Sequence, residues 1–210
     1  MKIYHGSKFT IEKPLVKGSD PHNDYGAAFY MTLDLESAHE WACRNNTIGI
    51  VNQYDFDMSG LEILDLRELS VLNWVAVLMH FRELEKSFVN SFAFRLKFLE
   101  DNYYIDVNQY DLVIGYRADD AYFRFPLEFV RGNITLEQLE FSFKLGELGV
   151  QYVLMSEKAV NKLKFVKSFP SEQKYVGKYF NRVTVTTKVF NELNKDSDGT
   201  RIQNLVRNKL

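Results

Sequence analysis

The sequence predicts an α+β fold, in which helices pack against antiparallel β-sheets. Short stretches with the alternation of a β-strand recur along the chain, and few segments have the length and spacing of a long amphipathic helix. The 210 residues, of which 46% are apolar and 26% charged, are typical of a soluble globular protein. A chain of this length forms one large domain, or one domain with an appendage.

The chain begins with MKIYHGSKF, and its apolar residues Ile3 and Tyr4 indicate a first strand that ends at the His-Gly-Ser segment of residues 5–7. Glycine and serine are common in turns, so the strand can simply turn there. Alternatively, the strand end presents an imidazole and a bare backbone to a ligand. Residues 13–25 hold two of the four prolines and predict a long irregular loop, after which residues 27–32 are expected to form a strand.

The next segment is expected to be a helix over residues 33–46, because Asp34 is a suitable N-cap and apolar residues follow at helical spacing. Residues 49–57 alternate as a strand, and residues 61–66 are expected to form another. A serine at the start of residues 70–86 and their apolar spacing predict a second helix, which belongs to the core.

Further strands are expected in the second half at residues 110–120, 150–155 and 163–169. Between the first two of them, residues 122–132 are interrupted by Pro126, and a short helix over residues 135–146 is expected to end at Gly146. The last two strands are joined by a helical turn that Ser156 can cap.

The composition changes after Pro170, where the chain becomes more polar and lacks a long apolar run. We therefore expect a domain over residues 1–170 and a C-terminal extension over residues 171–210. The extension is expected to be a peripheral strand and helix, or to be partly disordered.

Composition excludes several classes of function. A formal charge of −2 gives no strong basic patch for a polyanion. Cys43 is the only cysteine, which excludes an internal disulfide and a zinc ribbon and favours the cytoplasm. His39 and His80 have no partner at ligand spacing, so no metal site is expected. No apolar stretch approaches the ~18 residues of a membrane span, and none follows Met1, so we expect neither membrane insertion nor export.

Four segments carry residues of chemical interest: YHGS at 4–7, YGAAFYMT at 25–32, ESAHEWA at 36–42 and VQYVLMSEKAVNKLKF at 150–165. Together they resemble the ADP-ribosyltransferases of the diphtheria-toxin and poly(ADP-ribose) polymerase branch. In that family a strand ending in His-Gly precedes a Gly-x-x-Φ-Tyr strand and a helix with a Ser-Ala pair. A later strand begins with the catalytic glutamate. The resemblance covers about the first 165 residues and implies two split antiparallel sheets with flanking helices and a central NAD cleft.

The residues that the resemblance places at NAD are His5, Gly6, Ser7, Tyr30, Ser37 and Trp41. A nicotinamide ring carries a positive charge and a carboxamide, so its site needs aromatic faces and a rigid donor and acceptor. Tyr30 and Trp41 can supply the faces, and a cation over an aromatic face gains about 0.5–2 kcal/mol. Gly6 lets its backbone approach the carboxamide, and Ser37 can add a hydroxyl. In the family the histidine binds a ribose hydroxyl.

The catalytic residues implied by the resemblance are Gln151 and Tyr30. Gln151 stands where the family has its glutamate, which grips a ribose hydroxyl and adds a negative charge. Cleavage of the nicotinamide–ribose bond develops an oxocarbenium-like cation, and polar groups placed near it lower the barrier. Gln151 can still accept a hydrogen bond from the ribose hydroxyl through its amide oxygen, but it lacks the negative charge. Replacement of Gln151 by glutamate is therefore expected to raise turnover if the missing charge limits the chemistry.

The function that the resemblance implies is mono-ADP-ribosylation of a protein or nucleic-acid acceptor, with NAD as the substrate and nicotinamide as the product. Small bacterial proteins of this kind often act as intracellular toxins paired with a small antitoxin. Two alternatives remain open: a non-catalytic module that binds NAD or ADP-ribose, and an NAD glycohydrolase that uses water as the acceptor.

Several charged residues have no assigned role. Asp119 and Asp120 end a strand as a paired carboxylate, which we interpret as a solvated turn rather than a site for metal or acid–base work. Arg82 and Arg117 are candidates to meet the pyrophosphate of NAD, and Lys17 lies in the loop expected near the pocket.

Overall fold

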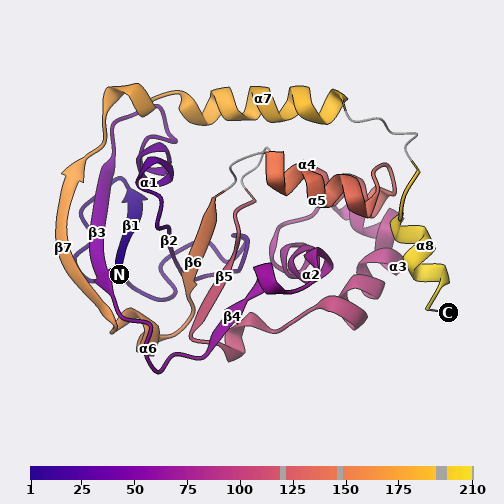
Figure 1. The fold of residues 1–210 in the computed structure, drawn as a ribbon, viewed down its shortest axis with the longest axis horizontal. Coiled ribbons are helices and arrows are strands. Elements are labelled where there is room, and N and C mark those ends of the chain that lie inside the picture. Colours follow the sequence, from indigo (N-terminus) through magenta and orange to yellow (C-terminus); the bar gives the residue numbers. More distant parts are fainter. Residues whose placement is uncertain (119–121, 146–148, 193–197, 210) are drawn as a thin grey trace.

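Two small sheets carry the strands in the computed structural model, which describes residues 1–118, 122–145, 149–192 and 198–209 (Figure 1). The mixture of sheets and helices confirms the expected α+β class. The first sheet is antiparallel with the order β1-β3-β7, formed by β1 (Lys2–Ser7), β3 (Ile50–Phe56) and β7 (Leu163–Pro170). Alternating apolar residues put Ile3 and Tyr54 on one face of it, where both are fully buried.

The second sheet has the order β2-β6-β5-β4 and is mixed. Its strands are β2 (Phe29–Met31), β4 (Ile63–Asp65), β5 (Leu112–Tyr116) and β6 (Val150–Leu154). The strands β2, β6 and β5 pair antiparallel, whereas β4 pairs with β5 in parallel. The expectation of purely antiparallel sheets was therefore wrong at β4. Parallel neighbours need a long crossover, and the helices between residues 66 and 109 provide it.

The second sheet is buried on both faces, which explains the apolar runs in β5 and β6. Leu112 and Leu154 pack between the two sheets with Ile3 and Tyr54. Their neighbours Val113 and Val153 face the opposite side and belong to a second cluster with the helices. This arrangement fixes which side chains of β6 share a face, since residues two apart along a strand point the same way.

The helical layer on that side includes α2 (Val71–Phe81) and α3 (Lys86–Tyr103). Trp74 of α2 is fully buried, and its indole N–H donates to the hydroxyl of Tyr25 at 2.9 Å. Ser70 caps α2 as expected, but the helix ends at Phe81 rather than near residue 86. The separate helix α3 was not expected from the sequence pattern.

A shorter helix, α1 (Leu35–Ala42), packs on the first sheet against β1 and β3. Asp34 accepts hydrogen bonds from the backbone N–H groups of Glu36 and Ser37, which confirms it as the N-cap. The segment around Pro126 is not interrupted, because α4 (Arg124–Arg131) includes this proline in its first turn, where a missing N–H costs nothing.

The remaining helices are α5 (Leu136–Leu145), α6 (Glu157–Val160), α7 (Lys178–Glu192) and α8 (Ile202–Arg207). Ser156 caps α6 as expected, whereas the predicted stop of α5 at Gly146 lies outside the described residues. Before α7, Tyr175 stacks on His39 of α1 with ring centroids 4.5 Å apart. The helix α7 then runs from the side of α1 toward α4, where Phe190 packs on Phe125 (Figure 1). In the described part of the chain no helix is long and apolar enough to cross a membrane.

Candidate functional site

The end of β1 places His5 against the second sheet. Its Nδ1 lies 2.6 Å from the carbonyl oxygen of Tyr30, and its ring contacts Phe29 at 4.5 Å between centroids. A carbonyl only accepts, so Nδ1 carries the hydrogen and Nε2 is left as an acceptor. The pKa of His5 is lowered to about 4, mainly by burial; the hydrogen bond to Tyr30 raises this pKa, and the positive charge of Arg44 lowers it. His5 is therefore neutral at pH 7.

Gly6 presents backbone groups at the edge of the first sheet. The N–H and C=O of Tyr4 pair with Thr32 at 2.8 and 2.9 Å, in an isolated bridge between β1 and the residue that follows β2. Alternate residues of a strand direct their N–H and C=O to the same edge. The N–H and C=O of Gly6, two residues after Tyr4, consequently point away from β3 and to the side of β1 on which Tyr30 lies. A planar amide placed there could bond to both the N–H donor and the C=O acceptor of Gly6.

Gly6 also allows α1 to approach β1 closely. A Cβ atom at residue 6 would overlap the carbonyl oxygen of Ala38 and lie 2.6 Å from the backbone nitrogen of Ala42. Both neighbours are helix backbone, which cannot rotate away as a side chain can.

Replacement of Gly6 by alanine is therefore expected to reduce the free energy of unfolding by about 1–3 kcal/mol. Urea denaturation measures the loss. Gly18→Ala is the matched control, because its nearest neighbour would be the Leu15 side chain at an ordinary 3.4 Å. Equal stabilities of the two variants would contradict the close approach of α1.

Ser7 closes the turn after β1. Its hydroxyl accepts a hydrogen bond from the Asn52 amide at 3.0 Å and donates to the carbonyl oxygen of Phe9. The structure thus uses the Ser7 hydroxyl within the loop rather than directing it toward the other candidate residues.

Tyr30 lies in β2 and is partly exposed. Its hydroxyl donates to the carbonyl oxygen of Gly26 at 2.6 Å and accepts from the backbone N–H of Tyr25 at 3.1 Å. Burial is the largest cause that raises the pKa of Tyr30, so the phenol stays neutral. Tyr30 pairs with Val153 of β6, and Gln151 is two residues away. The side chains of Tyr30 and Gln151 therefore lie on the same face of the sheet.

Ser37 of α1 brings this helix next to the start of β6. Its buried hydroxyl donates to Asp34 at 2.6 Å. On its other side lies Gly149, where a Cβ atom would be 3.4 Å from the Ser37 oxygen. The helix that carries two of the predicted NAD-binding residues thus lies close to Gly149, which directly precedes the strand that carries Gln151.

Trp41, one helical turn beyond Ser37, lies between arginines. The guanidinium carbons of Arg44 and Arg117 are 4.5 and 4.6 Å from its ring centroid. The ring is thus engaged with two cations rather than presented as an open platform, and the pair of guanidinium groups forms a positive region suited to phosphate oxygens. Arg82, the other arginine considered for that role, instead contacts Asp24 at 3.4 Å.

Gln151 of β6 has an unsatisfied side-chain atom. Its Nε2 lies 3.4 Å from a carboxylate oxygen of Asp24. Among the described residues its Oε1 is buried and has no hydrogen-bond partner. Buried polar atoms are normally paired, so this oxygen is an acceptor available to a ligand.

The structure therefore brings most of the predicted residues together. His5 contacts Tyr30, Tyr30 and Gln151 share a face, and Ser37 adjoins the start of β6. Ser7 is the exception, and Asp119 and Asp120 lie outside the described residues. Asp24 was not among the predicted site residues, because it lies in a segment expected to be an irregular loop.

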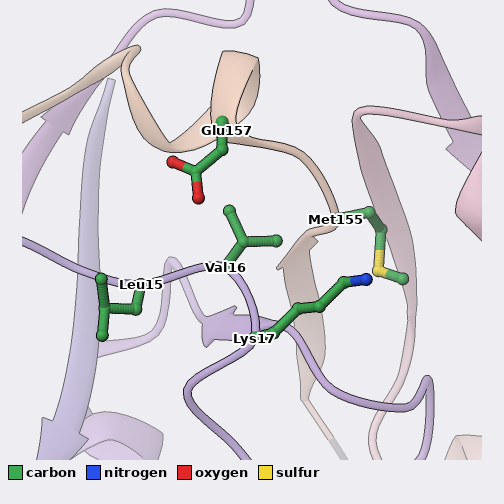
Figure 2. A pocket seen from close by; sticks show the side chains of 5 residues that line it. All are labelled: Leu15, Val16, Lys17, Met155 and Glu157. Atoms are coloured by element: carbon green, nitrogen blue, oxygen red, sulfur yellow. The ribbon is translucent and has the colours of Figure 1, made fainter.

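A surface hollow of about 470 Å³ lies elsewhere, lined by Leu15, Val16, Lys17, Met155 and Glu157 (Figure 2). The Lys17 side chain extends toward Met155, and the Glu157 carboxylate faces Val16. Met155 follows the end of β6, whereas Gln151 is near its beginning. The hollow and Lys17 are thus at the opposite end of the strand from the candidate site. The described residues hold no cluster of three or more histidine, cysteine or acidic side chains that could bind a metal.

Residues 1–165 match the model of a family described as a protein of unknown function (DUF3990). This stretch is more than half of the chain, so the chain belongs to that family. It includes all the candidate residues from His5 to Gln151 and ends before α7. No curated protein and no solved structure matches the chain.

Proposed function

We propose that this protein is a mono-ADP-ribosyltransferase of the diphtheria-toxin and poly(ADP-ribose) polymerase branch, which transfers ADP-ribose from NAD to a macromolecular acceptor. The buried, unpartnered Oε1 of Gln151 carries the proposal, because it is an acceptor poised on the same face as Tyr30. Two small sheets that meet at the Tyr4–Thr32 bridge support the split-sheet fold with a cleft.

In this reaction the bond between ribose C1′ and the nicotinamide nitrogen breaks, and its electron pair leaves with nicotinamide, which becomes neutral. The acceptor nucleophile forms the new bond to C1′ and loses its proton to water. Gly6 would hold the carboxamide through its backbone, and Tyr30 would border the ring. Gln151 Oε1 would accept a ribose hydroxyl, while Arg44 and Arg117 would face the pyrophosphate.

Incubation of the full chain with NAD tests the proposal, with nicotinamide release as the measurement. Nicotinic acid adenine dinucleotide is the matched substrate, because its carboxylate lacks the N–H donor and would place a negative charge beside the Gly6 carbonyl. We expect release from NAD and at least about tenfold slower cleavage of the acid analogue. No release with any acceptor extract, or equal rates for both substrates, would contradict the proposed site.

Two alternatives use the same residues. The absence of a carboxylate at position 151 favours a module that binds NAD or ADP-ribose without turnover, for which calorimetry would show binding and no nicotinamide. An NAD glycohydrolase would release nicotinamide without labelling a macromolecule. Labelled NAD separates the three outcomes in one experiment.

The resemblance also supports a cytoplasmic toxin that is neutralised by a small antitoxin. Expression in bacteria is then expected to arrest growth, and Gln151→Ala should relieve the arrest. Arrest that persists in this variant would argue against ADP-ribosylation as its cause.

A further inference from the structure

A buried carboxylate contacts the candidate glutamine. Asp24, in the loop before β2, is 5% exposed. Its Oδ2 accepts a hydrogen bond from the backbone N–H of Ala118 at 2.8 Å and lies 3.4 Å from Gln151 Nε2. Its Oδ1 lies 3.4 Å from the guanidinium of Arg82. An ionised aspartate is rarely buried unless it is paired, and here both oxygens have partners.

Asp24 determines how the Gln151 amide is oriented. An ionised carboxylate only accepts hydrogen bonds, so the amide must turn its NH₂ group toward Asp24. The carbonyl oxygen of the amide is then directed elsewhere, and it is this buried oxygen that has no partner among the described residues. Asp24 thereby makes Gln151 present an acceptor rather than a donor.

Asp24 also places a negative charge beside residue 151, where this sequence has a neutral glutamine instead of the glutamate of the ADP-ribosyltransferases. The contact with Arg82 is on Oδ1 and the contact with Gln151 is on Oδ2, so the negative end of the ion pair faces Gln151. In a buried environment such a fixed charge acts more strongly than in water.

We propose that Asp24 and Gln151 together perform the work of a single glutamate: Gln151 accepts the ribose hydroxyl, and Asp24 orients its amide and stabilises the developing cation. Asp24 is a positioning residue, because it acts through Gln151 and through its field. This inference rests on the proposed function, and it explains how a glutamine can stand at position 151 of a working transferase.

The test compares three isosteric variants of the full chain: Asp24→Asn, Gln151→Glu, and the double variant that exchanges carboxylate and amide between the two positions. Asp24→Asn is expected to lower kcat for nicotinamide release about tenfold to a hundredfold. KM for NAD should change less than about threefold, because the lost interaction acts mainly in the transition state. The double variant restores one carboxylate and one amide and is expected to recover the lost activity.

Gln151→Glu alone does not alter position 24 and therefore remains informative if Asp24→Asn folds poorly. Two adjoining carboxylates cannot both ionise easily, so its activity is expected to rise with pH through a midpoint well above the ordinary glutamate pKa of about 4.3. The double variant should lack this midpoint. Arg82 and Arg117 stay charged, and burial raises the pKa of Tyr25 and Tyr30, so these neighbours do not titrate between pH 5 and 8.

The outcomes separate the two proposals. Wild-type protein that releases no nicotinamide overturns the proposed function and this inference with it. Active wild type with an equally active Asp24→Asn variant overturns the inference alone. A double variant no more active than Asp24→Asn, or a Gln151→Glu variant with a flat profile above pH 5.5, shows that Asp24 is only structural.

Discussion

Replacement of Gln151 by alanine is expected to slow nicotinamide release by about 10²–10³, which corresponds to about 2.7–4 kcal/mol of transition-state stabilisation. The variant removes the buried Oε1 that has no protein partner among the described residues. Its loss should therefore affect the reacting complex more than the folded protein. We expect KM for NAD to change less than about threefold. Single-turnover kinetics at saturating NAD measure the effect.

Gln151→Met is the matched control, because methionine has a similar length and no amide. It is expected to be as slow as the alanine variant, since the lost acceptor and not the lost volume causes the effect. Urea denaturation of both variants shows whether the fold is retained. Wild-type turnover in the methionine variant would contradict a role of Gln151 in the reaction.

The second large effect is on stability as pH falls. The pKa of His5 is about 4 in the folded protein and 6.5 in its unperturbed state. The unfolded chain therefore takes up a proton first, so stability is complete above pH 6.5 and is lost between pH 6.5 and 4. The two pKa values correspond to about 3 kcal/mol for this histidine. Denaturant unfolding at pH 7, 5.5 and 4.5 measures the loss.

His5→Asn should reduce this pH dependence, because its amide can still donate to the Tyr30 carbonyl but does not titrate. His22→Asn is the matched control: His22 is exposed, and its Nδ1 also lies near a carbonyl oxygen, that of Phe81 at 3.2 Å. The pKa of His39 is also lowered, by burial, so part of the acid sensitivity remains in both variants. If the two variants respond identically to acid, His5 does not have the lowered pKa on which this prediction depends.

Much of the fold could be predicted because local pattern and tertiary environment agree in β3 and β6 and at the caps Asp34 and Ser70. The helix α3 was missed because its residues are mostly exposed and its backbone is interrupted at Phe92, where φ is −122° and ψ is 18°. Such an interruption removes the single continuous apolar stripe that periodicity detects. The parallel pairing of β4 was likewise invisible locally, because it depends on a crossover of more than forty residues.

In the candidate site too, some residues could be predicted from the sequence and others depend on contacts between distant parts of the chain. Tyr30 and Gln151 could be proposed from short segments, because those segments resemble the strand motifs of the ADP-ribosyltransferases. Asp24 could not, since its partners Arg82, Ala118 and Gln151 are 58, 94 and 127 residues away in the chain. The position of Trp41 between two guanidinium groups depends equally on contacts that no local pattern encodes.

The bridge between Tyr4 and Thr32 has a consequence for substrate choice. The bridge is isolated: among the described residues no backbone hydrogen bond joins Gly6 to Tyr30, whose carbonyl oxygen lies 2.6 Å from His5 Nδ1 instead. The Gly6 edge of the next rung of the ladder is thus open. A primary amide has the same donor and acceptor as a peptide group, and in that opening it can take the place of one missing rung. Selectivity for an amide would then be encoded in the main chain, and no single side-chain replacement that preserves the sheet could abolish it.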